Sequence, residues 1–346
     1  MPLEPRPKRR TRVAPVEYAP KNPGTNPAER GAALLTVLIL VAVIAVMAAT
    51  ALERLRLSTR LTANAVALDQ ARGLAYAAEA LATGRVTDLL RQSPSRVTLD
   101  GGWSNRPYTI PLPNGIATAR VSDGGNCFNL NSLVTDLDGM YVADPTTVVQ
   151  FARLARLLNV PGGEAIAAAA ADWIDSDDQA LGTGAEDSAY TGLATPYRTA
   201  GTLMVDSSEL RAVTGVTAEA YQKLRPWLCT LPRAARSSIN INTLTPEQAP
   251  LVAMLLPDTL GIGQAAAGLL RRPPGGFSDT QDFWKIFAAS GVTADPAAEQ
   301  QTGITTKWFD LRITVNVAGS DVEERALIDA STLPAQLVSR QWGEAT

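Results

Sequence analysis

The sequence predicts an α+β protein, in which a long N-terminal helix precedes a small β-sheet that a large helical insertion interrupts. Three observations support this class. An alanine- and leucine-rich segment runs from residue 32 to 90 without a proline. Strand-like alternation occurs near residues 108–120 and again near 308–328. The residues between these two regions have mostly helical spacing, and 346 residues suffice for more than one domain.

The first helix contains an uncharged run of 22 residues between Arg30 and Glu53, long enough to span a bilayer. A secretory signal has a shorter apolar core followed by a small-residue cleavage site. Here the helical pattern continues past the apolar run, because Leu57, Leu61 and Ala65 begin a series at helical spacing. We therefore expect an N-terminal helix over 32–95, with 32–52 in the membrane and an amphipathic remainder outside it.

Charge is distributed unevenly along the chain. Residues 1–30 carry seven basic and three acidic groups, a net charge of +4, so the remainder of this −3 chain carries −7. A basic flank beside an apolar helix stays on the cytoplasmic side. The sequence thus predicts a cytoplasmic N-terminus and an acidic globular part across the membrane, although Arg54, Arg56 and Arg60 after the helix weaken the asymmetry.

The residue inventory excludes several kinds of chemistry. The chain has no histidine, which removes Ser-His-Asp and Cys-His catalysis and histidine-liganded zinc. Its two cysteines, Cys127 and Cys229, form no CxxC motif. An exported domain would pair them in one disulfide, whereas a cytosolic domain would keep two buried thiols. Both readings are open at this point.

The strand signals divide the rest of the chain. Tyr108–Ile110 and Ile116–Arg120 form one strand region, and Trp308–Val317 and Val322–Ile328 form the other. We expect residues 96–134 and 306–331 to build one sheet and residues 135–305 to form the inserted helical domain. Residues 332–346 are predicted to be a loose tail.

The insertion contains an internal repeat. "FNLNSL" at 128–133 and "ININTL" at 239–244 share one pattern of apolar residues and asparagines, and each precedes a helix-rich stretch. The pattern indicates a duplicated helical unit. The asparagines are expected to satisfy backbone groups where a strand turns into a helix, and a catalytic role is disfavoured.

The second copy resembles the helix-hairpin-helix modules of DNA-binding and competence proteins. In such modules a turn like Gly261-Ile262-Gly263 offers backbone amides to a phosphate. DNA binding also requires surrounding basic charge, and only Arg271 and Arg272 lie close. A membrane-anchored DNA-binding protein of the competence type is therefore the second hypothesis for function.

An acidic loop, "WIDSDDQALGTGAEDSAY", suggests a metal site. Its candidate ligands are carboxylates, which calcium prefers, with Asp172 just before them. These candidates are Asp175, Asp177, Asp178, Glu186 and Asp187. The spacing is near that of an EF-hand, but Ala180 stands where glycine is needed, so no EF-hand is predicted. The alternative is a solvated acidic loop with helix-capping aspartates.

The same carboxylates are not predicted to form an enzyme active site. No aromatic-rich sugar cleft lies nearby, and two acids on one loop seldom form a glycosidase pair. No nucleophile–base pair is visible elsewhere, so the protein is expected not to be an enzyme, and we predict no catalytic residues.

The N-terminus resembles that of type IV prepilins and type II secretion pseudopilins. The resemblance implies cleavage by a prepilin peptidase between Gly31 and Ala32, with residues 1–31 removed as a leader. Thr36 then occupies the fifth mature position, where the family usually has a glutamate that neutralises a neighbouring subunit's N-terminus. A subunit without this glutamate suits the filament tip. The alternative is a single uncleaved anchor helix.

The motifs together resemble the minor pseudopilin K family of type II secretion, from about Arg30 to Ile328. They are the "RGAALL" start, "CFNLNSL", "WIDSDD…EDSAY", "YQKLRPWLCTLP" and "ININTL". The resemblance implies a pilin-like fold: an N-terminal helix packed on a small antiparallel sheet, with an insertion of duplicated helix-hairpin-helix or SAM-like units. It also implies bound calcium and a Cys127–Cys229 disulfide.

The family resemblance implies a role in assembly. The protein would initiate and cap the pseudopilus that drives export of folded proteins across the outer membrane of a Gram-negative bacterium. Its expected partners are minor pseudopilins I and J in a tip complex, then minor pseudopilin H, major pseudopilin G and the prepilin peptidase. It would be a single-pass inner-membrane protein with a periplasmic globular part, and nucleic-acid binding is not expected.

Overall fold

The computed structural model describes residues 27–112, 115–256, 258–317 and 319–343. The chain forms two compact units that divide between Asn64 and Ala65. Most of the predicted leader, residues 1–26, lies outside the described residues.

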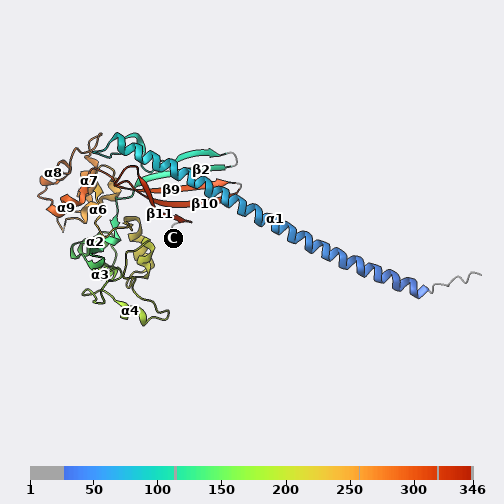
Figure 1. Cartoon of the computed structure of the whole chain (residues 1–346). Coiled ribbons are helices and arrows are strands. Elements are labelled where there is room, and N and C mark those ends of the chain that lie inside the picture. Colours follow the sequence, from blue (N-terminus) through green and yellow to red (C-terminus); the bar gives the residue numbers. More distant parts are fainter. Residues whose placement is uncertain (1–26, 113–114, 257, 318, 344–346) are drawn as a thin grey trace, which may run out of the picture. The chain divides into compact units, whose positions relative to one another are not determined.

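The first helix, α1, covers Pro27–Gln92, which confirms the long helix expected from the sequence (Figure 1). Every residue from 31 to 66 is exposed. Among the described residues, α1 is the one helix long and apolar enough to cross a membrane, judged by length and composition. Because no part of the chain that the structure describes covers this apolar surface, it is available to lipid or to other helices.

The second unit contains a five-stranded antiparallel sheet in the order β1-β2-β9-β10-β11 (Figure 1). Its strands are β1 (Tyr108–Leu112), β2 (Gly115–Asp123), β9 (Trp308–Val317), β10 (Ser320–Asp329) and β11 (Gln336–Trp342). The first four confirm the predicted strands. Alternate residues of β9 are buried, and together with the alanines of α1 from Ala71 to Ala82 they form one apolar core.

The tail was predicted wrongly, because Gln336–Trp342 is a strand rather than a loose segment. Six of its seven residues are exposed, so it lacks the apolar alternation that identifies a strand in sequence. Tertiary contacts hold it in place. Arg340 lies 2.5 Å from a carboxylate oxygen of Glu79 on α1 and 3.3 Å from one of Glu324 on β10. The Trp342 ring also packs edge-on against Tyr76 of α1.

The insertion between β2 and β9 has its own hydrophobic core. Its helices are α2 (Pro145–Leu157), α3 (Gly163–Asp172), α4 (Asp187–Thr191), α5 (Ala218–Leu224), α6 (Ala249–Ala253), α7 (Ile262–Leu270), α8 (Thr280–Ala288) and α9 (Pro296–Gln301). Its short strands are β3 (Phe128–Asn129), β4 (Val134–Leu137), β5 (Met140–Ala143), β6 (Leu228–Cys229), β7 (Ile239–Asn240) and β8 (Thr302–Gly303).

The sequence repeat corresponds to a repeat in structure. In the first copy β3 pairs in parallel with β6, and in the second copy β7 pairs in parallel with β8. The first asparagine of each motif lies in the leading strand of its pair, as Asn129 and Asn240 respectively. The last strand of each copy thus pairs with the first strand of the same copy.

The asparagines satisfy backbone groups, as the sequence predicted. Asn131 accepts a hydrogen bond from the Met204 amide (2.7 Å) and donates one to the Met204 carbonyl (2.9 Å). Asn242 makes the same pair of bonds with Phe277, at 2.7 and 3.1 Å. Both asparagines are fully buried, so each replaces the water that these backbone groups would otherwise need.

The contacts of β11 lead to a pH-dependent prediction. Burial, and then the Glu79 carboxylate, raise the pKa of Glu324 to about 7, while Arg340 opposes the shift. We expect Arg340→Met to lower the free energy of unfolding by about 2–4 kcal/mol at pH 8, below the usual loss for a fully buried pair because Arg340 is 30% exposed. The loss should be smaller at pH 5, where Glu324 is neutral in the folded state.

Urea unfolding of the Arg340→Met variant at both pH values measures this effect. The matched control is Arg91→Met, which removes an exposed α1 arginine 4.0 Å from Asp88 and should change stability little. An equal loss at pH 5 and pH 8 would show that the arginine acts through packing alone.

Candidate functional site: a buried carboxylate cluster

Helix α3 positions the first carboxylate of the acidic loop. The helix is buried along most of its length, with Ile166 and five consecutive alanines up to Ala171 in the core. Asp172 ends the helix, and Asp175 follows three residues later, bonded through its amide to the Ala171 carbonyl (2.9 Å). Because residues three apart share a face of a helical turn, the two carboxylates lie on the same side of the chain.

The return of the loop brings a third carboxylate to the first two. Asp172, Asp175 and Glu186 each offer one oxygen, and these three oxygens lie within 4.8 Å of one another. The residues are 0%, 3% and 6% exposed. Gly184 allows this approach, because a Cβ atom at that position would lie 1.9 Å from Oδ2 of Asp172.

Three of the six carboxylate oxygens in the cluster lack a donor among the described residues. Asp172 accepts hydrogen bonds from the Leu181 amide at 3.1 and 3.2 Å. In contrast, Oδ1 of Asp175 and both side-chain oxygens of Glu186 are buried without a hydrogen-bond partner among the described residues. Buried charges are normally paired or coordinate a metal, so these three oxygens are candidate ligands for a cation.

Electrostatics lead to the same conclusion. Burial, followed by the charges of Glu186, Asp177 and Asp172, raises the pKa of Asp175 to about 7. Burial and the charges of Asp172, Asp177 and Asp178 raise the pKa of Glu186 to about 7. Since carboxylates repel one another, the cluster stays ionised at neutral pH only at a cost in stability unless a cation binds. Carboxylate oxygens in a loop are the ligands that calcium prefers, so the residues fit that ion.

The structure assembles part of the predicted ligand set. Asp175 and Glu186 belong to the cluster. Asp177 and Asp178 are exposed at the loop surface, where Asp177 accepts a hydrogen bond from the Gln179 amide (2.8 Å). Asp187 is held elsewhere, by Arg198 at 3.0 Å and by Thr199.

Asp172 is not among the ligands predicted from the sequence, although the structure places it in the carboxylate cluster. Asp172 reads as the last residue of a buried helix, and its side chain could be taken for a cap. The signal that could have identified it is the three-residue spacing to Asp175, which places both on one face of a helical turn.

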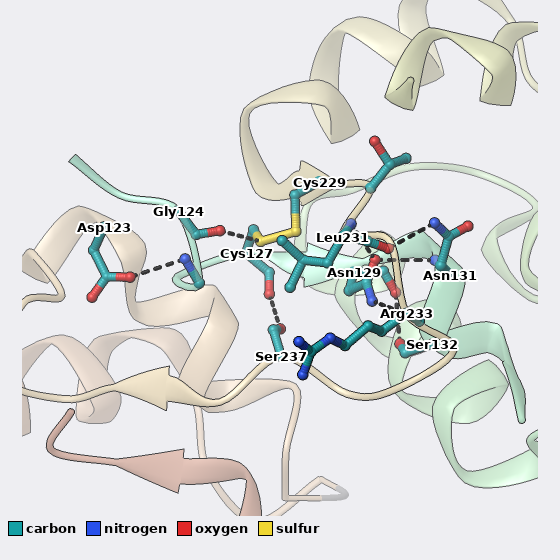
Figure 2. Close-up of a disulfide and its surroundings, with 12 residues drawn as sticks. Asp123, Gly124, Cys127, Asn129, Asn131, Ser132, Cys229, Leu231, Arg233 and Ser237 are labelled. Carbon is teal, nitrogen blue, oxygen red and sulfur yellow. Dashed lines mark hydrogen bonds between the residues drawn. A yellow bond between two sulfur atoms is a disulfide. The ribbon is translucent and has the colours of Figure 1, made fainter. Parts of the chain in front are cut away.

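A disulfide lies at the base of the first repeat copy. Cys127 and Cys229 are bonded, with Cα atoms 5.8 Å apart across 102 residues of sequence. Figure 2 shows the bond beside Asn129, whose side chain accepts from the Leu231 amide (2.9 Å) and donates to the Arg233 carbonyl (3.1 Å). The thiol alternative is thereby set aside, and the disulfide joins the strands where the first copy begins and ends.

Family comparisons identify the chain. Two family models, both described as type II secretion system (T2SS), protein K, match residues 126–233 and 239–307, which correspond to the two repeat copies. Type II secretion system protein K of Pectobacterium carotovorum subsp. carotovorum is 33% identical over 322 residues, covering 91% of this chain and 97% of that protein. The chain belongs to this protein K family.

Further relatives agree. Protein K of Aeromonas hydrophila is 35% identical over 295 residues, covering 83% of this chain and 88% of that protein. The solved structure of a GspK-GspI-GspJ complex from enterotoxigenic Escherichia coli contains a chain that is 31% identical with a TM-score of 0.69. The match covers 80% of this chain and 97% of that one.

These comparisons assign the protein a role as a minor pseudopilin of the type II secretion system, anchored to a membrane by α1. They do not favour the alternative of a DNA-binding protein. The family is one of structural secretion components and is not a known enzyme family.

The disulfide leads to a stability prediction. Because a cross-link over 102 residues restricts the unfolded chain, we expect reduction to lower the free energy of unfolding by about 2–5 kcal/mol. Chemical unfolding with and without reductant measures the loss. The double variant Cys127→Ala/Cys229→Ala is the control, because the chain has no other cysteine and the reductant should then have no effect. An unchanged stability on reduction would contradict the prediction.

Proposed function

We propose that this protein is the tip subunit of the type II secretion pseudopilus, where it assembles with minor pseudopilins I and J. The observation that carries this proposal is the likeness to the K subunit of a GspK-GspI-GspJ complex over 80% of the chain. Minor pseudopilin H and major pseudopilin G would follow below the tip. In this position the protein initiates and caps the filament that drives export of folded proteins across the outer membrane.

The N-terminal helix supports an assembly role. Its residues 31–66 are all exposed, so the membrane span can pack against the helices of other subunits once it leaves the lipid. Thr36 donates its hydroxyl to the Ala33 carbonyl (2.9 Å) of its own helix. Because threonine is uncharged, Thr36 presents no charge to a neighbour's N-terminal amine, which suits a subunit with nothing above it. The bulk of the insertion would block addition beyond the tip.

We place the globular part in the periplasm and the N-terminus in the cytoplasm, with α1 in the inner membrane. The +4 leader and the −7 remainder favour this orientation. The disulfide supports it, because disulfides persist in the oxidising periplasm. A prepilin peptidase would cut between Gly31 and Ala32.

The two repeat copies are assigned to the helix-hairpin-helix or SAM-like class as structural units. Arg272 supports a structural use of the second copy. Its guanidinium donates to the carbonyls of Leu244 (2.6 Å) and Ile241 (3.2 Å), so it closes the repeat instead of facing a phosphate. The protein is accordingly assigned no catalytic activity.

Calcium is the proposed ion of the carboxylate cluster. Asp172, Asp175 and Glu186 would supply oxygen ligands, and the ion would neutralise charges that burial otherwise disfavours. The ion would fix the loop between α3 and α4. The far end of this loop is already fixed by the ion pair between Asp187 and Arg198.

The calcium proposal predicts a stabilisation that depends on pH. Without calcium, stability should fall as pH rises from about 4 to about 7, because the folded pKa values of Asp175 and Glu186 lie above their ordinary values of 3.8 and 4.5. With 1 mM calcium the Tm at pH 7.5 should be higher by about 5 °C or more than in chelator. Differential scanning calorimetry measures both effects.

The matched variants are Glu186→Gln and Asp178→Asn. The first removes a buried ligand and should abolish most of the calcium-dependent shift in Tm. The second removes an exposed acid from the same loop and should leave the shift intact. A Tm that is the same with calcium and with chelator would leave the cluster without an ion.

The processing proposal predicts an intact mass that corresponds to residues 32–346 for protein extracted from native membranes. Mass spectrometry before and after reduction and alkylation tests it together with the disulfide, since two thiols should be labelled only after reduction. A full-length chain would mean an uncleaved anchor.

The tip assignment itself is tested by purification of the affinity-tagged protein from native membranes in mild detergent. Minor pseudopilins I and J should be recovered with it in stoichiometric amounts. Recovery of the protein without I and J would contradict the assignment.

A further inference from the structure

A groove on the insertion, distinct from the carboxylate cluster, contains a buried arginine with two nitrogen atoms that have no hydrogen-bond partner among the described residues. It lies between the second half of α2 and the connection 159–164 that leads into α3, and its volume is about 700 Å³. Its walls are mostly apolar. They include Val148, Val149, Ala152, Val160 and Pro161. Val149 is 62% exposed, which is unusual for a branched apolar side chain beside a cavity.

Arg153 lines this groove and is the residue that needs explanation. It is 5% exposed, yet its Nε and Nη1 atoms have no hydrogen-bond partner among the described residues. Arg156, one turn away, differs, because it is exposed and pairs with Asp258 at 3.3 Å. A guanidinium stays charged at neutral pH, so Arg153 carries a buried charge, and two of its three guanidinium nitrogen atoms are unsatisfied.

The start of α3 supplies a second feature of the same groove. Gly162 precedes this ten-residue helix with a φ of +69° and provides no side-chain cap. Gly163 packs tightly on α2, since a Cβ atom there would lie 2.6 Å from that of Ala155. The first amides of the helix therefore lack a capping side chain, and helix N-termini favour anions.

The charges around the groove leave Arg153 as its distinctive group. Glu164, in the first turn of α3, and Arg156 also line the groove, but both are exposed to solvent, whereas Arg153 is buried. Asp258 is occupied by Arg156. Lys223 donates to the Asn159 carbonyl (3.0 Å) and pairs with Glu219. Burial lowers the pKa of Arg153; the Asp258 charge opposes this shift and the Arg156 charge adds to it.

We propose that this groove is a docking site for a partner protein that inserts a carboxylate, from an aspartate or glutamate flanked by apolar residues. The carboxylate would accept charge-assisted hydrogen bonds from Arg153, and the uncapped end of α3 would add to the attraction. The apolar walls would contact the flanking side chains of the same segment. A small inorganic anion would leave these walls uncovered, so the shape favours a peptide. This proposal does not depend on the tip assignment.

The first test separates a receptor arginine from a structural one. A buried charge without partners costs stability in the unbound protein, so Arg153→Met should raise the Tm of the full chain in detergent by about 2 °C or more. An arginine that holds the fold would give the opposite result. Arg153→Lys serves as the second variant if Arg153→Met does not fold.

The second test measures binding directly. Dansyl-labelled, C-terminally amidated peptides Val-Asp-Val and Val-Asn-Val are titrated against the full chain, and fluorescence is recorded. The aspartyl peptide should bind at least about tenfold more tightly than the asparaginyl peptide. The Arg153→Met variant should lose this difference, whereas Arg91→Met, which removes an exposed arginine of α1 outside the groove, should retain it within about threefold.

Three results would overturn the proposal. Equal binding of the two peptides would show that the carboxylate is not recognised. A preference for the aspartyl peptide that persists in Arg153→Met would show that Arg153 is not the group that recognises it. Displacement of the aspartyl peptide by inorganic phosphate at equal concentration would indicate a site for small anions in place of a docking site for a protein.

Discussion

A buried polar junction between the sheet and the insertion is the constraint on which the rest of the structure depends. Asn240 donates to the Val97 carbonyl (3.0 Å) and to Thr306 (2.8 Å), and its amide donates to Asn126 (2.8 Å). Asp123 at the end of β2 accepts from Thr306, which precedes β9. These bonds join the points where the chain leaves and re-enters the sheet. The sheet can therefore accommodate a large insertion between β2 and β9 without a change in the pairing of its strands.

The same arrangement explains how a large insertion coexists with a small sheet. Each repeat copy ends in a parallel pair of strands next to its own start, and the disulfide closes the first copy covalently. The sheet and the second half of α1 then form a separate core. In the proposed filament, this arrangement would leave the sheet and α1 available for contacts with other subunits, while the insertion presents its own surfaces.

Two sites on the insertion share one physical feature, a buried charged group with atoms that lack a hydrogen-bond partner among the described residues, and the two charges have opposite signs. Asp175 and Glu186 have unpaired oxygens, for which a divalent cation is the natural partner. Arg153 has unpaired donors beside apolar walls, for which the carboxylate of a protein segment is the natural partner. We expect the unpaired atoms at both sites to reduce the stability of the chain without a ligand, and each site is therefore informative about a ligand.

The sequence by itself determined the elements with strong periodicity. The long helix, four of the five sheet strands and the duplicated asparagine motif could all be predicted, because apolar spacing and repeated residues record them locally. Tertiary structure alone decided the remainder. The polar strand β11 exists because Arg340 meets Glu79 and Glu324, and Asp172 joins the carboxylate cluster because the loop returns Glu186 to it. Arg153 reads as one more polar residue of an amphipathic helix, and only packing reveals that it is buried without a partner, since burial arises from contacts between segments far apart in the chain.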